Sequence, residues 1–265
     1  MDMGITGRKA LVCGASMGLG LACAEALARE GVDITIVARR EDALQDAAER
    51  LRRDPAVPTG TQIVAIGADI TSDTGRAKVL ASGTDFDIVV TNAGGPPPGD
   101  FHDWSREDWL KALDANMLAP IELIKASIDG MAERGFGRIV NITSSAVKAP
   151  ISILGLSNGA RSGLTGFVAG LARMPRYASA NVTVNNILPG PFETDRLRQT
   201  IAVGAERGGR SVEEETSIRQ QANPARRFGQ PVEFGAACAF LCSAHAGFIT
   251  GQNLLLDGGS YSGTF

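Results

Sequence analysis

The chain has 265 residues, of which 44% are hydrophobic and 21% are charged, and its formal net charge at pH 7 is −3. These values are ordinary for a soluble protein with a full core. They give no electrostatic reason to expect nucleic acid or an anionic membrane as a partner.

The sequence indicates one cytoplasmic domain over residues 1–265. No apolar run reaches the roughly 20 residues that a bilayer-spanning helix needs. The segment Met1–Gly4 lacks the basic start and the apolar core of a signal peptide, and no linker-like stretch divides the chain. Four cysteines lie within apolar patterns and without the paired spacing of a zinc site, so we expect buried thiols and no metal. They are Cys13, Cys23, Cys238 and Cys242.

The first chemical signal is a glycine-rich turn. Residues 10–13 predict a strand, residues 21–27 predict a helix, and three glycines stand between them. Glycine allows the backbone conformations of a tight turn, and its missing Cβ lets a phosphate approach. The free N–H groups at the helix start also favour an anion. We therefore predict a pyrophosphate-binding turn made of Gly14, Ser16, Met17, Gly18, Leu19 and Gly20.

The second predicted strand, Asp33–Ala38, ends in Arg39 and Arg40. A dinucleotide-binding unit distinguishes its two cofactors at this position. A carboxylate would bind the adenosine ribose, whereas two guanidiniums offer charge-assisted bonds to a 2′-phosphate. This favours NADP(H) over NAD(H). The alternative is that both arginines only begin the solvated helix Glu41–Arg53.

Two further strands are predicted over Gln62–Ile66 and Asp87–Val90, each followed by small or polar residues. Ligands of an open parallel sheet lie beyond the carboxyl ends of the strands. We expect Asp69 and Ile70 to meet the adenine. We expect the segment Asn92, Ala93 and Gly94 to pass close to the ribose.

A helix is predicted around Trp109–Ala126, with Ser105 and Asp108 forming its N-terminal cap. Asn116 lies inside this helix. Its amide either faces a site or is a polar group satisfied within the core.

The motifs along the chain resemble, in order and at suitable spacing, the short-chain dehydrogenase/reductase family, and most closely its 3-oxoacyl-carrier-protein-reductase-like members. This resemblance implies an α/β fold, a Rossmann-type doubly wound parallel sheet of about seven strands with helices on both faces. It also implies a homotetramer or homodimer. The motifs that carry it are Cys13–Gly20, Asn92–Gly94, Asn116, Arg138–Ser144, Pro189–Gly190 with Thr194, and Leu256–Gly259.

The resemblance implies a catalytic relay of four residues, which are an Asn, a Ser, a Tyr and a Lys four residues after the Tyr. Asn116 and Ser144 match the first two positions, but Ser157 stands at the Tyr position and Arg161 at the Lys position. A serine hydroxyl is a much weaker acid than a phenol, and arginine stays protonated. Arg161 is therefore expected to bind the cofactor ribose and to supply positive potential, without acting as a base.

Three readings follow from this altered relay. The first is an NADP(H)-dependent oxidoreductase that interconverts a carbonyl and an alcohol on a small molecule. Asn116, Ser144, Ser157 and Arg161 would then orient the substrate, and the proton would come from water or from Lys148, unless Lys148 is a solvated loop residue. The second is a regulatory or non-catalytic NADP(H)-binding protein. The third is a non-redox elimination or isomerisation, which no residue specifically favours.

The remaining predictions concern the loop after the strand Val182–Leu188. Pro189, Gly190 and Thr194 resemble the family loop that holds the nicotinamide carboxamide. The segment 191–224 has the composition of a mobile substrate lid, with a solvated surface helix as the alternative. Arg196 and Arg198 either meet an anionic substrate or only contribute surface charge, and His102 is a weaker catalytic candidate on the substrate side.

Overall fold

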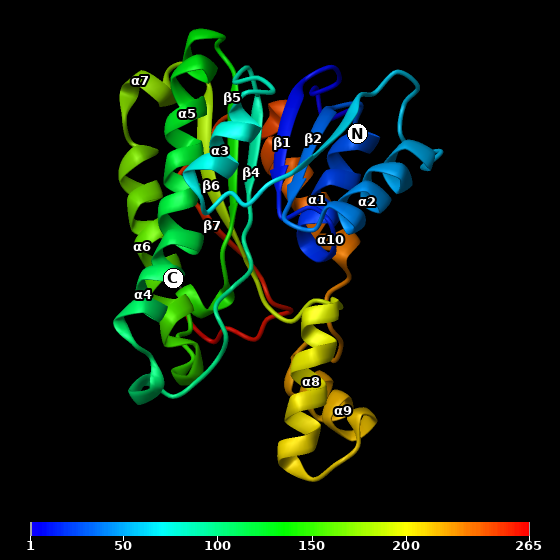
Figure 1. Cartoon of the computed structure of the whole chain (residues 1–265), viewed down its shortest axis with the longest axis vertical. Helices are drawn as coiled ribbons and strands as arrows, with labels where there is room; N and C mark the ends of the chain where they lie inside the picture. The colour runs from blue at the N-terminus through cyan, green and yellow to red at the C-terminus, as the bar shows by residue number, and fades with distance from the viewer. Residues whose placement is uncertain (1, 265) are drawn as a thin grey trace.

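The computed structural model describes residues 2–264, and within them a single parallel sheet of seven strands forms the centre of the molecule (Figure 1). The strand order is β3-β2-β1-β4-β5-β6-β7, which confirms the predicted Rossmann-type sheet. The strands are β1 (Lys9–Cys13), β2 (Asp33–Ala38), β3 (Ile63–Gly67), β4 (Ile88–Thr91), β5 (Gly137–Ile142), β6 (Val182–Pro189) and β7 (Asn253–Leu256).

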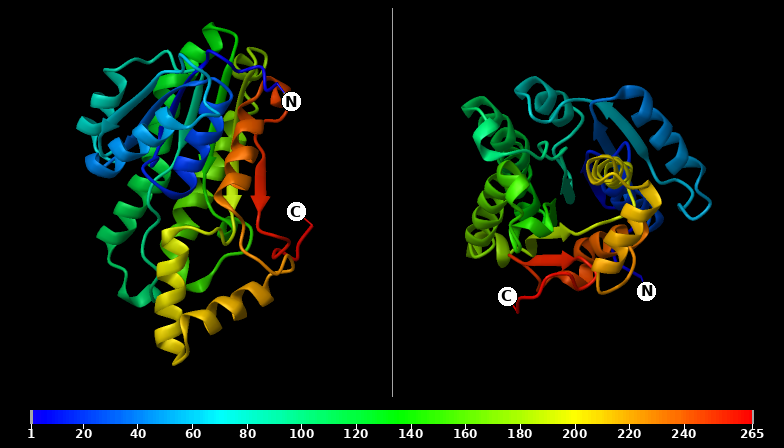
Figure 2. Two further views of the ribbon diagram at one scale, coloured as in Figure 1. Left: turned by 90° about the vertical axis from the view of Figure 1, so that its right-hand side faces the viewer. Right: turned by 90° about the horizontal axis from the view of Figure 1, so that it is seen from below.

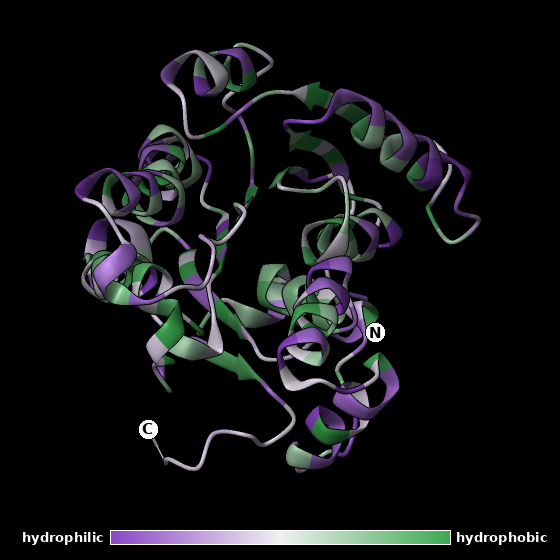
Figure 3. Cartoon of the chain, turned by 60° about the horizontal axis from the view of Figure 1, so that its bottom comes forward, coloured by the Kyte–Doolittle hydropathy of each residue, from purple (hydrophilic) through white to green (hydrophobic). Residues whose placement is uncertain are grey.

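Helices cover both faces of this sheet, as the two views of Figure 2 show. One apolar cluster joins α1, α2 and α10 to the strands, and a second joins α3, α5 and α6 to the opposite face. Figure 3 shows hydrophobic strands at the centre and helices that carry hydrophilic residues on their other sides. The helices of these two layers are α1 (Gly18–Arg29), α2 (Glu41–Arg53), α10 (Pro231–Cys242), α3 (Asp73–Leu80), α5 (Ala119–Glu133) and α6 (Gly155–Leu171).

The strand order reverses beside β1, which pairs with β2 on one side and with β4 on the other. Ala10 of β1 is opposite Ile34 in the first pair and opposite Ile88 in the second. The chain therefore leaves β1 and β4 in opposite directions across the sheet, and a crevice opens beyond their carboxyl ends. This topology determines where a ligand-binding site lies, at the carboxyl ends of β1 and β4.

The predicted helix around Trp109–Ala126 is confirmed, but it contains a π-helical turn that the sequence pattern did not predict. The structure divides it into α4 (Arg106–Leu113), a π-helical turn over Asp114–Leu118, and α5. The π turn widens the backbone by one residue, and the buried Asn116 donates from Nδ2 to the carbonyl oxygen of Ala112, 3.3 Å away. The cap was predicted correctly, since Ser105 forms a capping box with Asp108.

The predicted lid segment forms two helices, α8 (Asp195–Gly208) and α9 (Val212–Ala222), which project away from the sheet (Figure 1). The buried carboxylate of Glu215 on α9 pairs with Arg210 of the intervening loop at 3.0 Å and with Arg219 of the same helix at 2.6 Å. Nη2 of Arg219 in turn donates to the Thr200 carbonyl oxygen of α8 at 3.4 Å, which joins the two helices. The short α7 (Pro175–Ala178) precedes β6. Among the described residues, no helix is long and apolar enough to cross a membrane.

Candidate active site

A cleft of about 1170 Å³ lies beyond the carboxyl ends of the strands and under the start of α8. Most residues that the sequence singles out line it, although they come from distant parts of the chain. Gly20 and Asn116 lie outside its lining, as do the weaker candidates Lys148, Arg198 and His102. The predicted residues in the lining are Gly14, Ser16, Met17, Gly18, Leu19, Arg39, Arg40, Asp69, Ile70, Asn92, Ala93, Gly94, Ser144, Ser157, Arg161, Pro189, Gly190 and Thr194.

The glycine-rich turn between β1 and α1 forms one end of the cleft. Gly14 has φ +60°, and a Cβ there would lie 2.6 Å from Nδ2 of Asn92, which donates to the Gly14 carbonyl oxygen at 3.3 Å. A Cβ on Gly20 would overlap the same carbonyl oxygen. Gly20 therefore keeps α1 close to β1 and serves packing, whereas Gly14 and Gly18 face the cleft.

The N-terminus of α1 opens towards the cleft without a competing anion. Met17 is the N-cap residue and makes no side-chain cap hydrogen bond, and the first turn of α1 holds no acidic residue. The free N–H groups and the positive end of the helix dipole are thus left for an external ligand. The positive end of the helix and its free N–H groups suit the charge of a pyrophosphate.

Arg39 and Arg40 lie exposed at the end of β2, on the rim beside the turn. Nη2 of Arg40 lies 3.7 Å from Sδ of Met17, so this side chain reaches back across the turn. Burial acts to raise the pKa of Asp69, but hydrogen bonds from Thr71 and the charge of Arg39 outweigh it and hold that pKa below its ordinary value. Both guanidiniums are exposed on this rim, where they could bind an anion.

The opposite end of the cleft is formed by α6, on which Ser157 and Arg161 lie one turn apart. Both side chains are buried, each with 7% of its surface exposed. Nη1 of Arg161 donates to the carbonyl oxygens of Ile142, at 3.0 Å, and of Thr143. The guanidinium is thereby held behind the end of β5, next to Ser144.

The hydrogen bonds of Arg161 leave part of its guanidinium unused. Within the described residues, its buried Nε has no hydrogen-bond partner. Burial, and to a smaller extent the charge of Arg196, lower the pKa of Arg161 to about 10. The side chain is therefore still fully protonated at neutral pH, and it presents a poorly solvated positive charge to the cleft.

Ser144 also faces the cleft, at the end of β5. Its Oγ accepts from the backbone N–H of Ala146 at 3.1 Å, which leaves the hydroxyl hydrogen free to donate to a ligand. Lys148 does not belong to the lining, and its ammonium lies 5.7 Å from the centroid of the Tyr261 ring. The structure therefore does not support Lys148 as the substitute donor.

Arg196 is a site residue that the sequence left undecided between a substrate contact and a surface charge. It lies in the first turn of α8, lines the cleft, and places Nη2 3.4 Å from the Pro96 carbonyl oxygen. Arg198, two residues later, is 67% exposed and pairs with Asp195 at 2.6 Å. Residues two positions apart in a helix point to opposite faces, so this spacing could have distinguished Arg196 from Arg198 in the sequence. His102 lies outside the lining and pairs with Asp100.

Glycines on α6 bring this helix close to α4 and the π turn. A Cβ on Gly159 would lie 2.9 Å from the Trp109 ring, and one on Gly163 would lie 2.7 Å from Sδ of Met117. Gly155 makes the same kind of contact with Trp104. This packing fixes the rotation of α6 and hence the direction of Ser157 and Arg161.

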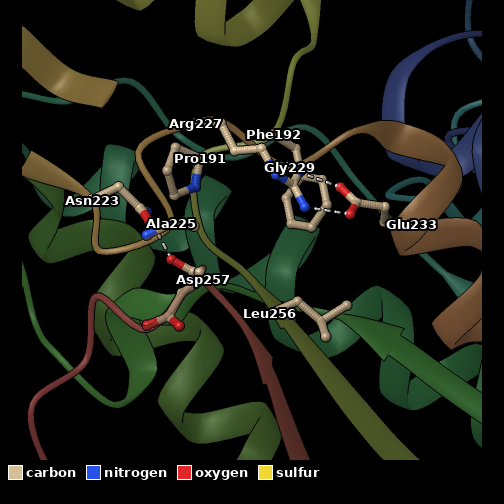
Figure 4. A pocket seen from close by; sticks show the side chains of 10 residues that line it. Pro191, Phe192, Asn223, Ala225, Arg227, Gly229, Glu233, Leu256 and Asp257 are labelled. Carbon is tan, nitrogen blue, oxygen red and sulfur yellow. Dashed lines mark hydrogen bonds and ion pairs between the residues drawn. The ribbon is translucent and has the colours of Figure 1, made fainter. Parts of the chain in front are cut away.

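A smaller pocket of about 170 Å³ lies where α8 and α9 join the body of the protein (Figure 4). Arg227 pairs with Glu233 across it at 2.6 Å, and Nδ2 of Asn223 donates to the Asp257 carbonyl oxygen at 2.8 Å. The guanidinium of Arg227 and the backbone N–H of Gln230 donate hydrogen bonds to the Glu233 carboxylate and lower its pKa to about 2. These bonds anchor the base of the helix pair.

Comparisons with known proteins agree with this geometry. A family model described as enoyl-(acyl carrier protein) reductase matches residues 14–261. The 3-oxoacyl-[acyl-carrier-protein] reductase of Vibrio cholerae is 33% identical, with 98% of this chain and 99% of that relative covered. The acetoacetyl-CoA reductase of Cupriavidus necator is 31% identical over 98% of this chain and 100% of its own length. The structure of L-sorbose reductase from Gluconobacter frateurii, complexed with NADPH and L-sorbose, has a TM-score of 0.91 and 29% identity, covering 99% of this chain and 100% of that one.

Proposed function

Since the chain belongs to the short-chain dehydrogenase/reductase family and is an oxidoreductase, we propose that it interconverts a carbonyl and an alcohol on a small molecule with NADP(H). One observation carries this proposal. A single cleft holds Arg39 and Arg40 at one end, an uncapped helix N-terminus beside them, and Ser144, Ser157 and Arg161 at the other end.

The cofactor part of the proposal rests on how well the residues present fit NADP(H). The turn of Gly14 and Gly18 and the first N–H groups of α1 would hold the pyrophosphate, and Arg39 with Arg40 would hold the 2′-phosphate. Asn92, Gly94 and the loop from Pro189 to Thr194 would contact the ribose and the carboxamide. Bound in this way, NADPH supplies a hydride to the carbonyl carbon.

The residues at the far end would stabilise the charge that reduction creates. As the carbonyl carbon is reduced, negative charge develops on its oxygen. The hydroxyls of Ser144 and Ser157, which both line the cleft, would donate hydrogen bonds to this oxygen, and the charge of Arg161 would lower the energy of the oxyanion. Asn116 would act on the site indirectly, because its hydrogen bond fixes the π turn against which α6 packs.

The proton must come from a source other than the family tyrosine. Among the described residues that line the cleft, no tyrosine, lysine or histidine is present. We propose that water in the cleft protonates the oxyanion. A general acid typically contributes about 10²–10⁴-fold, so turnover without one is expected to be slow.

A homodimer or homotetramer also belongs to this proposal. Leu110, Leu118 and Phe167 are apolar side chains exposed on α4, the π turn and α6. Burial in a subunit contact would remove them from water. Light scattering of the purified chain would give the mass of the assembly, and a monomer would contradict this part.

Hydride transfer is tested with NADPH deuterated at the transferable position. The protein is incubated with a panel of ketones and aldehydes, and product alcohols are searched for deuterium by mass spectrometry. We expect deuterium in at least one product and none when heat-denatured protein is used. Tight NADPH binding without any deuterium transfer would favour a non-catalytic NADP(H)-binding protein.

A further inference from the structure

The oxyanion formed in carbonyl reduction accounts for the charge of Arg161, but not for a second guanidinium at the reaction end of the cleft. Arg161 enters from α6 and Arg196 from the first turn of α8, and the charge of Arg196 acts on Arg161. Two guanidiniums in one cleft repel each other unless an anion lies near them. One carboxylate, that of Asp195, lines the same end, but it accepts from Arg198 at 2.6 Å.

The placement of Arg196 is specific. Its guanidinium lies on the backbone of the loop that follows β4, where a Cβ on Gly95 would come within 2.7 Å of Nη1. The Pro96 carbonyl oxygen, 3.4 Å from Nη2, holds it on the cleft side. This loop also carries Gly94, so Arg196 lies beside the part of the cleft assigned to the cofactor ribose, on the lid side of it.

The second observation is the unused hydrogen-bonding capacity of Arg161. This side chain is 7% exposed, its Nη1 is engaged by two carbonyl oxygens, and its buried Nε has no partner among the described residues. A buried, partly unsatisfied guanidinium is costly and gains most from an anionic acceptor. Carboxylates match the planar fork of arginine.

We propose that the substrate is a small oxo acid or hydroxy acid, whose carboxylate is bound by Arg196 with support from Arg161. This proposal rests on the proposed function, since it places the reacting carbonyl at Ser144 and Ser157. Arg196 is then the residue that determines specificity. Leu154 and Leu197, which also line the cleft, would contact the apolar remainder of the substrate.

The test uses unreactive probes, so that it does not depend on turnover. Oxamate and malonamate are monoanions that carry an amide carbonyl, and oxamide and malonamide are their uncharged counterparts. Binding of each to the protein saturated with NADPH is measured by quenching of the cofactor fluorescence and by calorimetry. We expect at least one anion to bind about 10-fold or more tightly than its uncharged counterpart, as a charge-assisted bond provides.

The variants separate Arg196 from general surface charge. Arg196→Gln should weaken binding of the anion about 10-fold or more, leave the uncharged counterpart unchanged, and leave the Kd of NADPH within about twofold. Arg196→Lys should recover part of the loss. Arg207→Gln is the control, because it removes the same charge from an exposed position of α8 that does not line the cleft, and it should change none of these values.

Three results would overturn the proposal. They are equal binding of anions and uncharged probes, equal losses in Arg196→Gln and Arg207→Gln, and a loss of NADPH affinity in Arg196→Gln as large as the loss for the anion. The last result would make Arg196 a cofactor ligand. Anion binding with no deuterium transfer in the carbonyl panel, extended to small 2-oxo and 3-oxo acids, would instead contradict the proposed function and leave the anion site in place.

Discussion

Selection of NADP(H) by Arg39 and Arg40 gives the sharpest prediction for the cofactor site. We consider the double variant Arg39→Ala, Arg40→Ala. Both side chains are exposed on the rim of the cleft, at the end of β2, and Arg40 already reaches back to Met17. NADPH and NADH differ only in the 2′-phosphate, so a contact to that group must affect one cofactor and not the other.

The expected size follows from the exposure of both guanidiniums. A hydrogen bond to a charged group contributes about 1.5–3 kcal/mol, and solvent screening places these two at the lower end. Because about 1.4 kcal/mol changes Kd tenfold, loss of both contacts should weaken NADPH binding by about 100-fold. NADH binding should change by less than about threefold, since only a screened long-range attraction is lost.

The assay is a fluorescence titration of each cofactor at fixed, low ionic strength. Arg50→Ala with Arg53→Ala is the control, because it removes two charges from exposed positions of α2 that face Glu25 and Glu49 instead of the cleft. The control should leave both Kd values unchanged. Equal weakening of NADPH and NADH in the rim variant, or no weakening of NADPH, would refute the assignment.

Three further predictions concern the reaction centre, the turn and the base of the helix pair. Replacing Ser157→Tyr together with Arg161→Lys should raise carbonyl reduction by about 10²–10⁴-fold in an NADPH consumption assay, and no gain would show that the surrounding cleft has diverged as well. Gly20→Ala should lower the free energy of unfolding by about 1–3 kcal/mol in urea, because its Cβ overlaps the Gly14 carbonyl oxygen; unchanged stability would show that the turn can widen. Glu233→Gln should destabilise the protein at neutral pH. The ion pair with Arg227 and the hydrogen bond from Gln230 lower the pKa of Glu233 to about 2, so the carboxylate stabilises the fold above the ordinary carboxyl pKa and this stabilisation is lost as pH falls towards 2. A loss of stability in Glu233→Gln that stays constant over this pH range would contradict the reasoning.

Much of the fold was predictable from the sequence because its signals are local. The apolar runs at Asp33–Ala38 and Val182–Leu188 predicted β2 and β6 to within a residue of the observed ends. The π turn at Asp114–Leu118 was missed, since one additional residue per turn barely alters an apolar pattern of helical period. The turn is matched by tertiary contacts that a local pattern does not show, since Met117 and Trp109 pack into the glycine positions of α6.

The candidate site divides in the same way. The residues of the cofactor turn and of the altered relay follow from motifs, and the structure brings all but Gly20 and Asn116 into the lining of one cleft. The position of Arg196 could not be derived, because a charged residue at the start of a polar helix is typical of a solvated surface. Only the direction in which α8 leaves Thr194 decides which of two nearby arginines faces the cleft.

The glycines of α6 also bear on how the reaction centre is acquired during folding. The helix has five glycines in 17 residues, and each costs about 1 kcal/mol of helix propensity relative to alanine. Its helical state is therefore maintained by the aromatic and thioether side chains that α4 and the π turn pack against it, more than by its own backbone. A folding intermediate with the sheet complete and α4 still undocked would have the phosphate-binding turn and no ordered place for Ser157 or Arg161.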